Sequence, residues 1–202
     1  MDTHPLWRPY DVPSEEEIAQ ARVRAHVPEQ IEVVPPDPAW PARYDEVRRL
    51  VEQALGERVQ EIVHIGSTSV PGLHAKPVID VSVTVADTER EEDYLPALAA
   101  AGFVLTVREP EHRCLRLADP RTNLHVWNPG AAEPRRHVAF RDWLTGHADD
   151  LAAYSDLKCS LAGEGFTDVM LYNNRKAGLI YDIYERIFAA DPEHPHTPQP
   201  RA

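Results

Sequence analysis

The segment VIDVSVTV at residues 78–85 constrains the fold more than any other, because it alternates apolar and polar side chains. Its valines at every second position face one side of a strand, while Asp80, Ser82 and Thr84 face the other. One face of the strand therefore meets a core, and the other carries polar groups. A carboxylate without a partner is costly to bury, which favours a functional or ion-paired role for Asp80.

The remaining periodicity predicts an α+β domain. Strands are expected at residues 31–34, 59–65, 103–107, 113–117 and 122–127, and helices at 39–55, 90–101, 137–146, 148–162 and 169–189. Because strands dominate the first part and helices the last, we expect a mixed β-sheet core with flanking helices and a C-terminal helical cap. The domain is expected to span residues 31–189, with its core at 31–130 and its helical part at 136–189.

Two end segments are expected outside this domain. Residues 1–30 form an N-terminal extension with a short docking helix, in which Ser14 is the N-cap and Glu17 stands at the capping-box position. Such a helix is marginal alone, so it must pack on the body or fray. We also consider the extension as a docking arm for a partner or for a second copy of the chain. The polar, proline-containing segment 190–202 is predicted to be disordered.

Composition excludes several classes of function. The formal net charge of −12 argues against broad, sequence-independent binding to nucleic acid or anionic lipid. Cys114 and Cys159 form no CxxC pair, so neither a disulfide framework nor a zinc knuckle is indicated, and both are expected to be reduced, semi-buried thiols. We see neither a signal-peptide pattern nor an apolar run long enough for a bilayer, and we expect a cytoplasmic protein with no membrane partner.

The loop in HIGSTSVPGLHAKPVID, residues 64–80, is longer than a simple connection between strands requires. It is not a Walker A loop, because five residues separate Gly66 from Gly72 and Leu73 follows. It is not a nucleophile elbow either, since the required glycine pair is missing and the next element is a strand.

A third interpretation fits the loop better. A strand leads to a Gly-Ser pair and a short loop, and the next strand starts with Asp80. Gly66 allows a phosphate to approach the backbone, Ser67 donates hydrogen bonds to phosphate oxygens, and Asp80 holds a divalent cation. This is the arrangement that nucleotidyl transfer requires.

The same segments resemble the GrpB family, also called UPF0157. The resemblance rests on HIGSTSVPGLHAKPVIDVSV, with PDPAWPARY upstream and NLHVW, FRDWL, YSDLK and NRKAGLIYDIY downstream, and it covers roughly residues 31–189. That family belongs to the nucleotidyltransferase superfamily and is sometimes fused to dephospho-CoA kinase. The resemblance implies a nucleotidyltransferase-type core in which Gly66 and Ser67 form the Gly-Ser pair and Asp80 is the first metal-binding carboxylate, with Mg²⁺ or Mn²⁺ as cofactor.

The chain departs from the pattern that the resemblance implies. Working members of the superfamily have a second acid two residues after the first and often a third on a neighbouring strand, where this chain has Ser82 and His125. One carboxylate holds Mg²⁺ weakly. The metal could arrive bound to a nucleoside triphosphate, or His125 could act as a base or bind a softer divalent ion.

Two hypotheses follow. The first is a metal-dependent nucleotidyltransferase that binds a nucleoside triphosphate and acts on a small acceptor. The second is a catalytically degenerate protein that binds a nucleotide or a CoA-type ligand as an accessory or interaction module. A homo-oligomer is considered for either.

Further polar residues are expected to contact the phosphates. They are Thr68 and Ser69 in the loop, Lys76 after it, and Arg141, Lys158 and Lys176 in the helical cap. Tyr154 and Tyr172 precede the two cap lysines by four residues and share their helix faces. The alternative for each cation is a solvated or ion-paired surface residue, and for His125 a hydrogen bond within the sheet.

Overall fold

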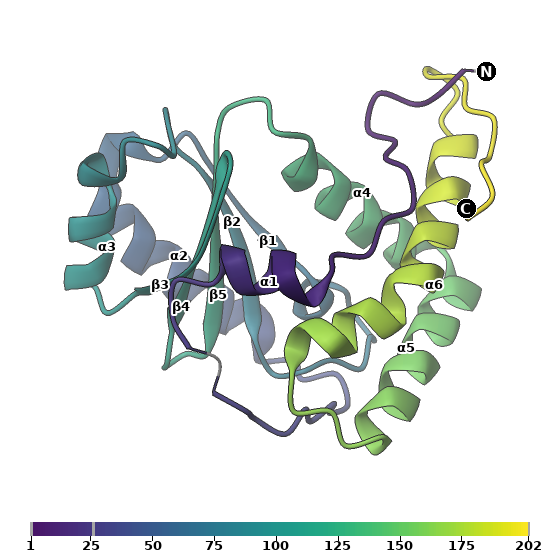
Figure 1. The fold of residues 1–202 in the computed structure, drawn as a ribbon, viewed down its shortest axis with the longest axis horizontal. Coiled ribbons are helices and arrows are strands. Elements are labelled where there is room, and N and C mark those ends of the chain that lie inside the picture. The colour runs from purple at the N-terminus through teal and green to yellow at the C-terminus, as the bar shows by residue number, and fades with distance from the viewer. Residues whose placement is uncertain (1, 26, 202) are drawn as a thin grey trace.

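The fold of residues 2–25 and 27–201 is described by a computed structural model (Figure 1). Within these residues five strands form one mixed sheet, in the order β1-β2-β5-β4-β3. Their bounds are β1 Glu61–Ile65, β2 Ile79–Thr84, β3 Val104–Glu109, β4 His112–Leu117 and β5 Thr122–Trp127. β2 and β5 pair in parallel, and the other neighbours pair antiparallel. The predicted α+β fold with a mixed sheet is confirmed.

Helices cover both sides of this sheet. Their bounds are α1 Glu15–Ala21, α2 Trp40–Leu55, α3 Leu95–Ala100, α4 Ala132–Gly146, α5 Ala148–Gly163 and α6 Val169–Ala189, with 3-10 turns at Gly56–Arg58, Ser67–Ser69 and Glu91–Asp93. In Figure 1, α2 and α3 lie to the left of the strands and α4, α5 and α6 to the right, while α1 crosses in front of them.

The hydrophobic core lies between the sheet and helices α2 and α3. Val81 and Val83 of β2 and Leu124 of β5 are buried there against Val47 and Val51 of α2. The alternation predicted for 78–85 is therefore correct, since Asp80 and Ser82 occupy the opposite face. That face is turned toward the helices that follow the sheet in the chain.

The helical cap packs directly on the loop between β1 and β2. Val70 and Leu73 of the loop are buried together with Leu144 of α4, Tyr154 of α5 and Ile183 of α6. Because the loop supplies these apolar contacts, the cap and the Gly-Ser segment have a defined relative position. The polar face of the sheet, the loop and the cap together enclose the candidate site.

Two predicted elements were wrong in detail. Residues 31–34 form no strand, and only Val34 pairs, in a single bridge with Ala75. The two prolines that follow have no backbone N–H and cannot extend a ladder. The helix predicted over 90–101 is divided into the turn Glu91–Asp93 and α3, with Pro96 in the first turn of α3.

The N-terminal extension packs on the body of its own chain. Ser14 and Glu17 form the predicted capping box of α1. Beyond the helix, Arg22 bridges to Val107 of β3, and its side chain pairs with Asp168 at 3.0 Å. Residues 1 and 26 of this segment lie outside the described residues.

The C-terminal segment differs from the predicted disorder. Its His196 ring lies 2.9 Å from Oε2 of Glu185 in α6, and the backbone N–H of Gln199 donates to the same oxygen at 2.7 Å. The backbone N–H of Thr197 donates to the carbonyl of Asp2, so the two ends of the chain lie side by side next to α6 (Figure 1). Composition alone does not reveal that one buried carboxylate, that of Glu185, is hydrogen-bonded to both His196 and Gln199. Residue 202 lies outside the described part of the chain.

Candidate functional site

The site is built around Asp80 at the start of β2. Asp80 stands opposite Asn123 of the parallel strand β5, and the Asn123 amide Nδ2 donates a 2.8 Å hydrogen bond to Oδ1 of Asp80. The second oxygen, Oδ2, faces Gly66. Burial raises the pKa of Asp80, while the Asn123 hydrogen bond and the positive charge of Lys76 act in the opposite direction.

Gly66 is required at this place for two reasons. Its φ is +69° and its ψ is −172°, a combination that essentially only glycine adopts. A Cβ atom at Gly66 would also lie 2.7 Å from Cβ of Asp80 and in contact with Oδ2. The loop therefore passes directly over the carboxylate, which accounts for the Gly-Ser pair at this position.

The loop hydroxyls have different roles. Thr68 is buried, and its hydroxyl donates to the carbonyl of Val78 and contacts His64 Nε2, so it ties the loop to the sheet. The Ser69 hydroxyl donates to the Gly66 carbonyl at 2.6 Å. Only Ser67 of this trio lines a cavity. Phosphate contacts were predicted for Thr68 and Ser69. Both hydroxyls already donate hydrogen bonds to backbone carbonyls, those of Val78 and Gly66.

A cavity of about 390 Å³ lies between the polar face of the sheet and the cap, and we call it the lysine cavity. Its lining includes Asp80, Ser67 and His125, with Lys76, Lys158 and Lys176. These are the three lysines of the whole chain, because every other basic residue among the 21 Lys and Arg is arginine. The concentration of all three lysines at one cavity is the feature that defines this site.

Each lysine rests on an aromatic ring from the cap. Lys158 Nζ lies 4.6 Å from the ring centroid of Tyr154, and Lys176 Nζ lies 4.4 Å from that of Tyr172. Both pairs join residues four apart on one helix, as predicted from their spacing. Lys76 Nζ lies 5.5 Å from the Tyr172 ring. These contacts stabilise cations weakly and leave the N–H donors available to an anion.

Among the three lysines, Lys158 has the least stabilisation of a positive charge by neighbouring groups. Its side chain is 2% exposed, and Nζ has no hydrogen-bond partner within the described residues. Burial, reinforced by Lys176, lowers the pKa of Lys158 to about 6, and burial and Lys76 lower the pKa of Lys176 to about 7. Lysine tolerates such a shift, whereas arginine stays charged. The cavity is thus suited to take up an anion together with protons.

A second cavity of about 380 Å³ adjoins the lysine cavity. The two share Gly66, Ser67, Tyr154, Asn173 and Lys176. The second combines apolar side chains of the loop, α4 and α6 with charged ones of α4, including Glu133, Arg136 and Arg141. Arg141 lies here rather than beside Asp80, and it donates to the His64 carbonyl at 3.1 Å. Arg141 therefore lines the second cavity together with Lys176, but it does not line the lysine cavity.

His125 was expected to take the place of a third carboxylate near Asp80. In the structure it lies two residues farther along β5 than the position beside Asp80. It stands opposite Ser82, while Asn123 takes the position beside Asp80. The sequence interpretation missed Asn123, as well as Glu109 and His112, which contact one another beside His125. The rarity of lysine could have marked the cavity in advance, but the parallel register that selects Asn123 has no local signal.

The donor atoms around Asp80 fit a metal only together with phosphate. Oδ1 of Asp80 already accepts a hydrogen bond, which leaves Oδ2 as the carboxylate ligand. The adjacent lysines oppose a bare cation. Mg²⁺ commonly binds through one or two carboxylates, substrate phosphates and water, so a Mg²⁺ or Mn²⁺ that shares phosphate oxygens fits this site.

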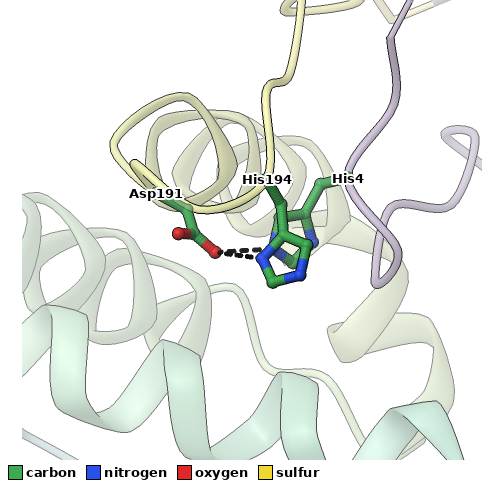
Figure 2. A group of neighbouring side chains, drawn as sticks. All are labelled: His4, Asp191 and His194. Carbon is green, nitrogen blue, oxygen red and sulfur yellow. Dashed lines mark hydrogen bonds and ion pairs between the residues drawn. The ribbon is translucent and has the colours of Figure 1, made fainter.

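A separate cluster of His4, Asp191 and His194 lies where the chain ends meet, and Figure 2 shows both rings beside one carboxylate oxygen. Each ring nitrogen lies 3.0 Å from Oδ2 of Asp191. However, the backbone N–H of Leu6 donates to Nδ1 of His4, so Nε2 carries the hydrogen and has no lone pair for a metal. We interpret the cluster as a hydrogen-bonded clasp between the termini.

The geometry defines an α+β protein with a cavity lined by a Gly-Ser loop, three lysines and the carboxylates of Asp80 and Glu109. A family profile described as "GrpB protein" matches residues 30–186. The chain therefore belongs to the GrpB family, as the sequence resemblance predicted.

Relatives agree with this assignment. A UPF0157 protein of Streptomyces coelicolor is 45% identical over 154 residues, which cover 76% of this chain and 82% of the relative. The dephospho-CoA kinase of Mycolicibacterium paratuberculosis is 30% identical over 202 residues, covering 86% of this chain and 48% of that protein. The chain thus corresponds to about half of that kinase.

A solved GrpB structure supports the fold. The crystal structure of GrpB from Enterococcus faecalis has a TM-score of 0.67 and 29% identity, and the match covers 78% of this chain and 97% of that one. The Cid1 poly(U) polymerase gives a TM-score of 0.44 at 14% identity, over 62% of this chain and 41% of the polymerase. Among the described residues, no helix is long and apolar enough to cross a membrane.

Proposed function

We propose that this protein is a nucleotidyltransferase that binds a nucleoside triphosphate with Mg²⁺ or Mn²⁺ and transfers its nucleotidyl group to a small acceptor. The observation that carries the proposal is the lysine cavity, which is lined by all three lysines of the chain and by the carboxylates of Asp80 and Glu109. Buried cations without full compensation are costly in the free protein. A polyphosphate supplies the missing negative charge.

We assign parts of the reaction to individual residues of the cavity. Ser67 and the backbone beside Gly66 contact the phosphates, and the lysines offset the charge that develops on the leaving pyrophosphate. Asp80 Oδ2 holds the metal, which when bound with the nucleotide polarises the α-phosphate and orients the attacking oxygen. The adjoining second cavity, with its mixed apolar and charged lining, offers room for a further part of the nucleotide or for the acceptor.

The second candidate is a degenerate member that binds a nucleotide or CoA-type ligand without turnover. The position beside Asp80 favours it, because Asn123 donates a hydrogen bond where a second carboxylate would bind metal. Ser82, two residues after Asp80, is buried and adds no charge. Under either hypothesis the ligand is a small phosphorylated molecule, and the two free cysteines accord with a reducing compartment such as the cytoplasm.

Calorimetric titration with ATP, GTP, CTP and UTP, with and without Mg²⁺ or Mn²⁺, tests the proposal when each mixture is also checked for pyrophosphate. Wild type is compared with Asp80→Asn, which keeps the size of the side chain, and with Asp156→Asn, an exposed aspartate on α5. We expect metal-dependent binding in wild type and Asp156→Asn, and its loss in Asp80→Asn.

The outcomes separate the two candidates. Pyrophosphate release that requires Asp80 supports the enzyme. Binding without release over a range of acceptors supports the accessory protein, and binding of none of the four triphosphates contradicts both.

A further inference from the structure

A chain of hydrogen bonds crosses three neighbouring strands beside the lysine cavity. Oε2 of Glu109, at the end of β3, lies 2.7 Å from Nδ1 of His112 in β4. Nε2 of His112 lies 3.0 Å from Nδ1 of His125 in β5. The chain leads from a carboxylate that is 48% exposed to a ring that lines the cavity.

Packing holds both rings in place. His112 is buried and stacks on Trp127, with the ring centroids 4.0 Å apart and the planes inclined by 15°. The planes of His112 and His125 are inclined by only 9°. His137 of α4 faces His125 at a centroid distance of 6.4 Å and closes the other side. The stacking therefore holds both rings in the orientation in which they are hydrogen-bonded, and Glu109, His112 and His125 all line the lysine cavity.

The chemistry of the groups places the hydrogens. The hydrogen bond from His112 lowers the pKa of Glu109, so its carboxylate is ionised and can only accept. Nδ1 of His112 therefore carries a hydrogen, and in the neutral tautomer of this ring the lone pair lies at Nε2. With that tautomer, Nδ1 of His125 is the donor of the second hydrogen bond, and the lone pair of His125 lies at Nε2.

This lone pair is available in the cavity. Burial lowers the pKa of His125 to about 3, so the ring is neutral near pH 7. In the part of the chain that the structure describes, only Nδ1 of His125 has a hydrogen-bond partner, namely His112. His125 also lies on the sheet face of Asp80, two residues beyond Asn123. An acceptor atom thus stands on the cavity wall near the carboxylate.

We propose that Glu109, His112 and His125 form a proton relay that activates a hydroxyl-bearing acceptor. This inference rests on the proposed nucleotidyl transfer. Nε2 of His125 takes the proton of the acceptor hydroxyl, the acceptor oxygen bonds to the α-phosphorus, and the bond to pyrophosphate breaks. The positive charge on His125 is shared through Nδ1–H with His112 and offset by Glu109. His125 is the catalytic residue, and Glu109 and His112 are positioning residues.

Nuclear magnetic resonance of the ligand-free protein tests the direction of the relay without any turnover. Long-range ¹H–¹⁵N correlation spectra distinguish protonated from unprotonated ring nitrogens, and a His125→Gln spectrum assigns the ring of His125. We expect a hydrogen on Nδ1 and none on Nε2 in wild type at pH 7. His112→Phe keeps a ring on Trp127 but removes the acceptor, so the second tautomer of His125 should appear. A hydrogen on Nε2 in wild type would overturn the relay.

The rate of turnover tests whether the relay acts in catalysis. We expect His125→Gln to lower the rate of pyrophosphate release about 10²- to 10⁴-fold, as for loss of a general base, with unchanged affinity for the nucleotide. Glu109→Gln should lower kcat less and shift its pH profile without changing KM. His147→Gln, exposed and remote from the cavity, is the control.

The possible failures are distinguishable. An unchanged rate in His125→Gln contradicts the relay while nucleotidyl transfer stands. No pyrophosphate from wild type contradicts nucleotidyl transfer, and with it the catalytic use of the relay, whereas the spectra still decide the direction of its hydrogen bonds.

Discussion

Asn123 donates its side-chain N–H to Oδ1 of Asp80 at 2.8 Å, across the one parallel pair among the described strands. This hydrogen bond fixes the carboxylate and leaves Oδ2 free beneath Gly66. It also puts a donor where a second carboxylate would repel Asp80, and this donor lowers the pKa of Asp80 against the larger effect of burial. The stability of the free protein and its metal affinity are therefore linked through this pair.

The substitution Asn123→Asp should make the stability of the protein depend on bound metal. Two adjacent carboxylates repel, so the pKa of one rises above its unfolded value and the variant loses about 1–3 kcal/mol of stability near pH 7. The loss should fade as the pH falls through the raised pKa, and Mg²⁺ should restore part of it. Urea unfolding at pH 5 and pH 8, with and without Mg²⁺, measures both effects. Equal stability of variant and wild type at pH 8 without metal would contradict this, and Asn174→Asp on α6 is the control.

Gly66→Ala should cost more than Gly72→Ala. Both glycines have positive φ, +69° and +81°, but a Cβ atom at Gly72 meets nothing within 4 Å. The left-handed conformation alone costs about 1–2 kcal/mol, and at Gly66 the collision with Asp80 adds to it. Urea unfolding compares the two variants directly. A smaller loss for Gly66→Ala would mean that the loop does not depend on its close approach to the carboxylate.

The buried lysines predict how stability depends on pH. Because the folded pKa of Lys158 is about 6 and lies below its unfolded value, the unfolded chain binds more protons above pH 6. The free energy of unfolding should therefore rise with pH from about 6 toward 10. Lys158→Met should flatten this slope, add about 1–3 kcal/mol near pH 6, and weaken binding of triphosphate.

Unfolding at pH 6 and pH 9, together with titration of tripolyphosphate, checks these expectations. Arg48→Met, an exposed change on α2, should leave the slope unaltered. A stability loss in Lys158→Met at pH 6 would show that the ammonium is well compensated in the free protein.

The hydrogen bonds between Glu185 and both ends of the chain predict a stability effect far from the cavity. Buried Glu185 accepts hydrogen bonds from Trp7 Nε1 at 2.7 Å, from His196 and from the Gln199 backbone. Glu185→Gln brings an NH₂ group against these donors, so we expect a loss of about 1–3 kcal/mol and faster proteolysis at both ends. Exposed Glu193→Gln is the matched control. Unchanged proteolysis would show that the ends do not depend on this carboxylate.

The two cysteines should differ in reactivity. Cys114 is buried, and burial raises the pKa of its thiol to about 12, whereas Cys159 is exposed on α5. The thiolate is the reactive form, so an alkylating reagent should modify the folded protein once, at Cys159. Mass spectrometry of the native and urea-unfolded protein reads this out. Modification of Cys114 in the native protein would contradict its burial.

Much of the fold is predictable from local patterns. The bounds expected for the strand 122–127 and the helix 169–189 coincide with β5 and α6, because periodicity and boundary residues act over a few residues. The prediction failed at 31–34, where backbone donors find partners far away, such as the Ile31 N–H with the Phe166 carbonyl. It failed also for the tail, which is tied down by the buried side chain of Glu185.

The candidate site divides in the same way. Near neighbours in the chain account for the Gly-Ser pair, for the position of Asp80 on the polar face of its strand, and for the spacing that places each cap lysine over a tyrosine. Tertiary contacts account for the presence of all three lysines in one cavity with Asp80, for Asn123 rather than His125 beside Asp80, and for the continuation from His125 to His112 and Glu109. These contacts depend on the order and register of strands far apart in the chain, and strand pairing is set by burial of the whole sheet rather than by any local pattern.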